Sequence, residues 1–139
     1  MYESLTKYLI EFPSGENGMW IIDRKNDVTP EHPIQMPHVN YSKLTRNFID
    51  DVYSFEEAHA EMDLNHYSDI LEANGIKWRM DSMSTVSIDS LDAKCVLAMI
   101  LGAVRAERFC DGALLRFFKN GSIARWLERL KELDTELQG

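Results

Sequence analysis

The spacing of apolar residues along the chain predicts a series of amphipathic helices. Segments 3–12 and 42–60 carry apolar residues at intervals of three and four, which is the period of a helix with one buried face. Pro13 ends the first segment, and Ser42 is placed to cap the second. The apolar stripe of the second segment comprises Tyr41, Leu44, Phe48, Val52 and Phe55.

The most apolar stretch is predicted to lie at the centre of the fold. A helix over 91–108, opened by Asp89 or Ser90, is apolar on every side between Cys95 and Val104. Because such a helix has no polar face for solvent, other helices must surround it.

Capping residues mark three further helices. Each begins at a side chain that can accept a hydrogen bond from the first turn and continues with apolar residues at helical spacing. They run from Asn65 to a stop at Asn74-Gly75, from Asp111 through 113–119, and from Ser122 through 123–137.

Three segments lack the helical period. Gly18 to Asp23 is a short apolar run followed by turn residues, which predicts an extended segment or one arm of a small β-hairpin near 18–38. Three prolines predict an ordered loop over 28–40, and 76–88 is predicted to be irregular with Trp78 against the core. The sequence thus predicts a mainly α fold, a compact bundle of about five or six helices in one globular domain, 1–139.

The distribution of charge narrows the class of partner. The net charge is −8, but residues 1–90 hold 16 Asp and Glu against 7 Lys and Arg, whereas residues 91–139 hold 7 against 8. A negative protein repels phosphate backbones, so direct nucleic-acid binding is disfavoured and a basic protein surface is the favoured partner.

Cysteine usage and hydropathy predict a cytoplasmic protein without a membrane partner. Cys95 and Cys110 do not form the dense framework of a small secreted domain. Residues 1–12 contain no apolar signal region, and the longest apolar run is about half of what a bilayer span requires.

One face of the 42–60 helix is acidic. A charged face is commonly only solvated, yet a regular array of carboxylates can also imitate a phosphate backbone and occupy a basic cleft. The candidate partner-binding residues on this face are Asp50, Asp51, Glu57 and Glu61.

Charged residues also cluster at the junction between the predicted helices 91–108 and 113–119. Arg105 and Arg108 could bind a carboxylate or phosphate bidentately, with Glu107 and Asp111 beside them. The favoured interpretation is structural: an ion-pair network that fixes the angle between the helices, with Asp111 as the cap. The candidate ligand-binding residues are Arg105, Glu107, Arg108 and Asp111.

No motif of catalysis or metal binding is found in the sequence. It has no GxSxG turn, phosphate loop or dinucleotide fingerprint, and its four histidines lack the paired spacing of a zinc site. Segments 113–119 and 123–137 superficially resemble a helix-turn-helix, but Glu128 and Glu132 interrupt the cations that would face DNA. We therefore expect a non-catalytic protein with no cofactor.

Three stretches carry a family resemblance: 104–134, 31–42 and 74–83. The most specific of their motifs is Arg105-Ala106-Glu107-Arg108-Phe109-Cys110-Asp111-Gly112. The chain resembles a family of short bacterial proteins, common in Firmicutes and their mobile elements, that is classed only as a domain of unknown function. This resemblance implies a bacterial or phage origin and no particular reaction.

Two functions remain open at this point. The leading hypothesis is a binding protein, encoded by a phage or mobile element, that inhibits or modulates a host defence factor through protein–protein contact, as a nucleic-acid mimic. The alternative is a module that binds a nucleotide or another anionic metabolite through the arginine cluster, with or without hydrolysis.

Overall fold

The computed structural model describes residues 1–14, 16–21 and 37–138, and within them the predicted mainly α fold is confirmed. Its elements in chain order are α1 (Glu3–Thr6), α2 (Tyr8–Glu11), η1 (Phe12–Ser14), β1 (Gly18–Ile21), β2 (His38–Tyr41), α3 (Lys43–Ala58), η2 (Ala60–Met62), η3 (Leu64–His66), α4 (Tyr67–Ala73), α5 (Met80–Thr85), α6 (Ala93–Ala106), α7 (Ala113–Lys119) and α8 (Ser122–Gln138), where η marks a 3-10 turn.

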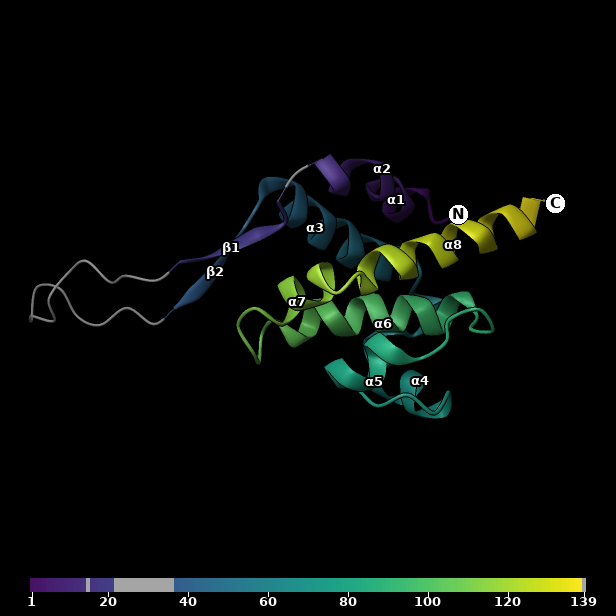
Figure 1. Ribbon diagram of the computed structural model, residues 1–139. Coiled ribbons are helices and arrows are strands. Elements are labelled where there is room, and N and C mark those ends of the chain that lie inside the picture. The colour runs from purple at the N-terminus through teal and green to yellow at the C-terminus, as the bar shows by residue number, and fades with distance from the viewer. Residues whose placement is uncertain (15, 22–36, 139) are drawn as a thin grey trace, which may run out of the picture.

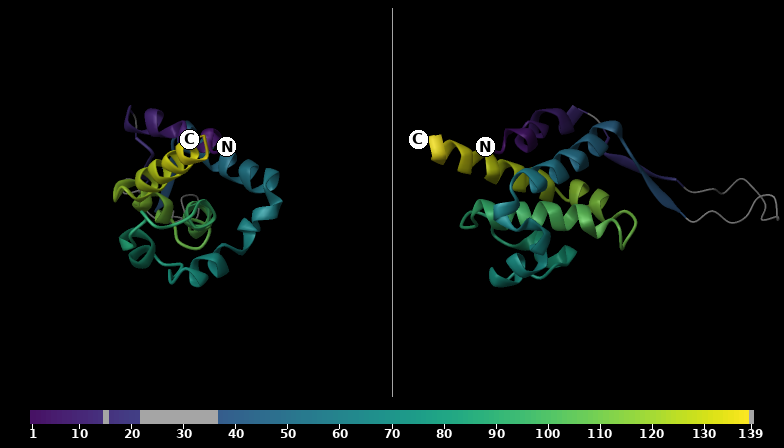
Figure 2. Two further views of the ribbon diagram at one scale, coloured as in Figure 1. Left: turned by 90° about the vertical axis from the view of Figure 1, so that its right-hand side faces the viewer. Right: turned by 180° about the vertical axis from the view of Figure 1, so that it is seen from behind.

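Helix α6 forms the centre of the fold, as its sequence predicts. Every residue from Cys95 to Val104 is buried. Helices α3, α4, α7 and α8 all contact α6, and the end-on view in Figure 2 shows the chain curving around it. Because burial of one large apolar side chain contributes roughly 1.5–3 kcal/mol, α6 is the main apolar support of the fold.

The ends of α6 differ from the prediction. Asp92 is the N-cap, because its Oδ1 accepts a hydrogen bond from the N–H of Cys95 at 2.9 Å. The predicted start at Asp89 or Ser90 is wrong because a turn, closed by the Leu91 N–H on Ile88 O at 3.1 Å, buries Leu91 before the helix begins. The helix also ends at Ala106 rather than at residue 108.

Helix α3 is capped as predicted. Ser42 Oγ accepts a hydrogen bond from the N–H of Thr45 at 3.2 Å, and the buried stripe includes Phe48, Val52 and Phe55. Tyr41, predicted as part of this stripe, belongs instead to β2, because the backbone of Ser42 is extended and the helix begins after it.

Strands β1 and β2 form the small antiparallel hairpin that the sequence allows. Gly18 lies opposite Tyr41, and Ile21 lies opposite His38. The prediction of a loop over 28–40 is therefore wrong for residues 38–40, because they pair with β1 as part of a strand. Residues 28–36 lie outside the described part of the chain. Figure 1 shows both strands running away from the helices.

Two local predictions between α3 and α6 are wrong. Asn65 does not cap α4, which begins after His66 without a side-chain cap, because the chain passes through η3 first. Residues 76–88 contain α5 rather than a wholly irregular connection. Met80 and Met83, three positions apart, both pack on the core, so they are a short helical stripe.

Trp78 is held against α6, as predicted. Its Nε1 donates a hydrogen bond to Gly102 O at 2.9 Å, and its ring meets Tyr67 edge to face at 5.1 Å. A Cβ on Gly102 would lie 3.3 Å from the indole, so the absence of a side chain there allows the close approach.

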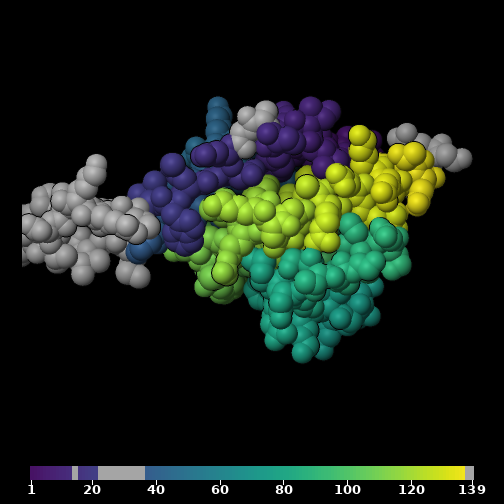
Figure 3. All heavy atoms as spheres, in the orientation of Figure 1, coloured from purple at the N-terminus to yellow at the C-terminus, as the bar shows by residue number. Residues whose placement is uncertain are grey.

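Helices α7 and α8 cross one face as a band, with α1 and α2 on one side of it and α4 and α5 on the other (Figure 3).

Ser122 does not cap α8: it lies within the helix, and its N–H bonds to Asn120 Oδ1 at 3.0 Å. Near the far end, Asp134 Oδ2 accepts a hydrogen bond from the N–H of Tyr2 at 2.9 Å, which fixes α1 on α8.

Candidate functional site

The segment between α6 and α7 is organised around Glu107. Its carboxylate accepts hydrogen bonds from the N–H of Gly112 at 2.9 Å and from the N–H of Leu114 at 3.0 Å. Gly112, with φ of +87°, is the N-cap residue of α7, and Asp111 is exposed. The predicted cap at Asp111 is therefore wrong, because the left-handed turn at Gly112 brings the Glu107 carboxylate to the free N–H groups.

Tyr41 joins the hairpin to this capping site. Its hydroxyl donates to Glu107 Oε1 at 2.5 Å and accepts from the N–H of Leu115 at 3.0 Å. Burial, and then the hydrogen bond to Glu107, raise the pKa of Tyr41 above its usual value, so the phenol stays protonated. Glu107 thus caps α7, a role that the sequence assigned to Asp111.

Arg105 and Arg108 lie over a shared aromatic ring. Their guanidinium carbons are 5.3 and 5.7 Å from the ring centroid of Tyr53 on α3. Across the part of the chain that the structure describes, neither guanidinium forms an ion pair or hydrogen bond, and Arg105 Nε is buried without a partner. The predicted ion-pair network is not formed, because the Glu107 carboxylate caps α7 and both guanidiniums lie over Tyr53.

A hollow of about 410 Å³ brings most of the predicted ligand-binding residues together. Glu107, Arg108 and Asp111 line the hollow. Arg105 does not line it but lies over the ring of Tyr53, which does. Its remaining walls come from β2, α3 and α6, through Val39, Tyr41, Ile49, Tyr53 and Val104.

The predicted partner-binding residues divide into two groups. Asp50, Glu57 and Glu61 are exposed. Asp51 is half-buried, accepts a hydrogen bond from Tyr8 Oη at 2.5 Å and pairs with Lys7 Nζ at 3.3 Å, so it joins α2 to α3. Sequence spacing cannot show this contact, because residues 8 and 51 meet only in the folded chain.

Two of the histidines contact carboxylates close to them in the chain. His59 contacts Glu61 at 3.2 Å, and His66 contacts Asp63 at 2.8 Å. No group of three or more His, Cys, Asp or Glu is placed to hold a metal within the described ranges. None of the helices described has the length and apolarity to cross a bilayer.

The two arginines of α8 considered for DNA contact hold backbone carbonyls instead. Arg125 donates to Ser84 O at 2.5 Å, and Arg129 donates to Leu91 O from Nη2 at 3.1 Å and Nε at 3.2 Å. Arg129 also pairs with Glu132, three positions on, at 3.2 Å. These guanidiniums fasten α8 to α5 and to the connection between α5 and α6.

A second hollow, of about 330 Å³, lies beside the same α6–α7 segment and was missed by the sequence analysis. It collects Phe109 and Cys110 from the motif with residues of α5 and α7. The sequence feature that could have indicated this hollow is Phe109, an aromatic residue in a polar turn. In the structure its side chain is 77% exposed.

Comparison with known proteins places the chain in a family. The profile of DUF6508, a family of unknown function, matches residues 2–136. The chain belongs to this family. No curated protein and no solved structure matches this DUF6508 protein.

Proposed function

We propose that this DUF6508 protein is a non-catalytic binding protein that presents an acidic surface to a basic partner. The observation that carries the proposal is that residues 47–76 hold eight Asp and Glu and no Lys or Arg. The exposed carboxylates in this stretch, which we call the acidic surface, are Asp50, Glu57, Glu61, Asp63, Asp69 and Glu72.

Because this stretch contains no Lys or Arg, its negative electrostatic field reaches further from the surface. Where Lys or Arg alternate with carboxylates, the potentials cancel within about one Debye length, roughly 8 Å at physiological salt. Over α3 and α4 the negative potentials of the carboxylates add, except where His59 contacts Glu61 and His66 contacts Asp63. The summed potential attracts a positively charged surface. The partner class that fits is a nucleic-acid-binding host protein, with carboxylates in place of phosphates.

The proposed setting is the bacterial cytoplasm. Both cysteines are free thiols, which suits a reducing compartment. The family resemblance supports a phage or mobile-element origin, and inhibition or modulation of a host defence factor is the role that follows from such an origin.

Charge reversal tests this proposal. The variant Asp50→Lys, Glu57→Lys, Glu61→Lys leaves the structural Asp51 intact, and a matched control carries Glu16→Lys, Glu128→Lys and Glu136→Lys at exposed positions elsewhere. Immobilised wild-type protein should retain basic proteins from a heparin-purified bacterial fraction, and added DNA should displace them. The first variant should lose this retention and the control should keep it; equal retention by both variants would exclude the acidic surface.

A second candidate function is anion binding at the arginine pair. The observation in its favour is that Arg105 and Arg108 have no carboxylate partner in the described part of the chain and that Arg105 Nε is buried and unbonded. A nucleotide phosphate beside the Tyr53 ring would satisfy these donors. In a thermal-shift screen with nucleotides, wild-type protein should be stabilised, Arg108→Ala should not, and Lys119→Ala should match wild type.

A further inference from the structure

The second hollow has the composition of a ligand pocket. We call it the aromatic–methionine pocket, because its apolar lining is made chiefly by Trp78, Met80, Met83, Phe109 and Phe117. Its volume of about 330 Å³ lies at the lower end of the range of roughly 300–1,000 Å³ for small-molecule sites. A pocket of this size and lining accommodates a small apolar body.

The walls of the pocket are held in place by the core. Met83 and Phe117 are buried, and Trp78 is fixed by its hydrogen bond to Gly102 O. Phe109 stands edge-on to Trp78 with ring centroids 5.8 Å apart. Apart from the exposed Phe109, these walls are therefore preformed, so a ligand would not have to order Trp78, Met83 or Phe117.

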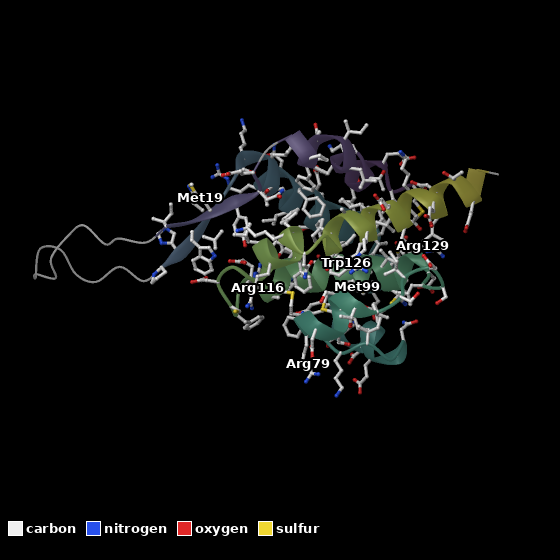
Figure 4. All side chains as sticks on the ribbon, in the orientation of Figure 1. Met19, Arg79, Met99, Arg116, Trp126 and Arg129 are labelled. Atoms are coloured by element: carbon white, nitrogen blue, oxygen red, sulfur yellow. The ribbon has the colours of Figure 1, made fainter. Side chains whose placement is uncertain are left out.

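The charged side chains around the pocket are cationic. Arg79 and Arg116 contribute to its lining, and no carboxylate does. Arg79 pairs with the exposed Asp81 at 3.3 Å, whereas Arg116 has no ion pair or side-chain hydrogen bond to any residue the structure describes. Figure 4 shows the two arginines on different elements with their ends apart, so they flank the pocket and do not meet over it.

We propose that the aromatic–methionine pocket binds a small apolar monocarboxylate, with its hydrocarbon body against Trp78 and Phe117 and its carboxylate on Arg116. Charge complementarity selects this class, because an apolar lining with a cationic edge favours an apolar anion over an amine or a neutral chain. The pocket is separate from the acidic surface, so this inference stands or falls independently of the proposed partner binding.

Octanoate is a suitable probe for this site. It should raise the melting temperature of the whole protein in a dose-dependent way, and calorimetric titration should show saturable binding. Octylamine, which has the same chain and the opposite charge, should give no stabilisation. Equal shifts for octanoate and octylamine, or no shift with octanoate, would overturn the proposal.

Substitution of the exposed cation separates the role of charge from folding. Arg116→Gln should weaken octanoate binding by about tenfold or more, because a charge-assisted hydrogen bond is lost, and it should fold normally because its side chain is exposed. Lys119→Gln, at an exposed position of the same helix outside the pocket, is the matched control and should bind octanoate like wild type. Loss of octanoate binding in both variants, or in neither, would contradict the assignment of the carboxylate to Arg116.

Cys110 provides a readout that does not depend on stability. It lines the pocket and is exposed, whereas Cys95 is buried, and burial raises the pKa of Cys95 to about 11. Iodoacetamide near neutral pH should therefore modify Cys110 alone, and saturating octanoate should slow this modification severalfold. Cys110→Ser, which should remain unmodified, verifies the site; an unchanged rate of Cys110 modification in octanoate would count against occupation of the pocket.

Discussion

The hydroxyl of Tyr41 donates a hydrogen bond to the Glu107 carboxylate at 2.5 Å, although the two residues are 66 positions apart in the chain. Through this contact β2, the end of α6 and the start of α7 are fixed together at one point. The hollow beside Arg108 has its walls on β2, α3, the end of α6 and the segment between α6 and α7. Its shape therefore depends on the bond between Tyr41 and Glu107.

Removal of the Tyr41 hydroxyl should destabilise the protein. Tyr41→Phe leaves the half-buried N–H of Leu115 without its acceptor and deprives Glu107 of a donor, so we expect a loss of about 1–3 kcal/mol in the free energy of unfolding. Urea denaturation measures this loss. Tyr53→Phe is the control, because the Tyr53 ring carries the arginine contacts and should lose less than about 0.5 kcal/mol.

Gly112 should tolerate a side chain less well than another glycine of similar backbone conformation. Gly112 has φ of +87° and an added Cβ would lie 2.3 Å from Trp20 Cζ2, whereas Gly121 has φ of +82° and nothing within 4 Å. Gly121→Ala should cost about 1–2 kcal/mol from backbone strain alone, and Gly112→Ala should cost more. Thermal unfolding of both variants tests this order.

A third variant identifies the cause of that difference. Trp20→Ala should remove the steric part of the Gly112→Ala penalty, so the double variant should approach the cost of the backbone strain alone. If the two glycine variants are equally stable, a side chain at position 112 meets no steric penalty from Trp20.

The planar guanidinium of Arg129 should be difficult to replace. Its Nε and Nη2 both donate to Leu91 O, and its side chain is largely buried. Arg129→Lys keeps the charge but loses this paired geometry, so it should lower the free energy of unfolding by about 1 kcal/mol, and Arg129→Ala by more. Lys131→Ala, an exposed neighbour on α8, should have little effect in the same denaturation experiment.

The protein should lose stability in alkaline solution. Burial raises the pKa of Cys95 to about 11, and burial followed by hydrogen bonds to Asp51 and Glu107 raises the pKa values of Tyr8 and Tyr41. The unfolded chain releases these protons at lower pH, near pH 8.5 for cysteine and 10 for tyrosine. Stability from these groups is therefore complete below about pH 8 and falls as the pH rises from about 8.5 to 11.

Denaturation at a series of pH values checks this dependence. The free energy of unfolding of wild-type protein should fall progressively above about pH 8.5, and the fall should be smaller in Cys95→Ala and in Tyr41→Phe. A flat or rising stability between pH 8.5 and 11 would contradict the raised pKa values.

The comparison of α6 with α5 shows which elements the sequence could predict. The ten-residue apolar run of α6 is unusual enough to identify a central helix without any knowledge of its neighbours. Helix α5 has six residues, and only Met80 and Met83 mark its inner face, so the pattern is too short to distinguish it from a loop. The cap at Ser42 was predicted correctly because its hydroxyl reaches the first turn of its own helix, whereas the cap of α7 was predicted wrongly because the Glu107 carboxylate takes the place of Asp111.

The candidate sites show the same division. The sequence placed Arg105, Glu107, Arg108 and Asp111 close together because they lie within seven consecutive positions. It could not show that Glu107 is taken up by α7 and Tyr41, or that Asp51 is held by Tyr8, because these partners are far away in the chain. The aromatic–methionine pocket was missed for the same reason, since its residues come from three separate segments.

The sequence by itself determined the mainly α composition, the central position of α6 and the acidic character of residues 47–76, since periodicity, hydrophobicity and charge are local properties. Tertiary structure alone decided which charged side chains remain available. A carboxylate or guanidinium is no longer available when the fold brings a donor or an acceptor within a few ångströms of it, as Tyr41 comes to Glu107 and Leu91 O to Arg129.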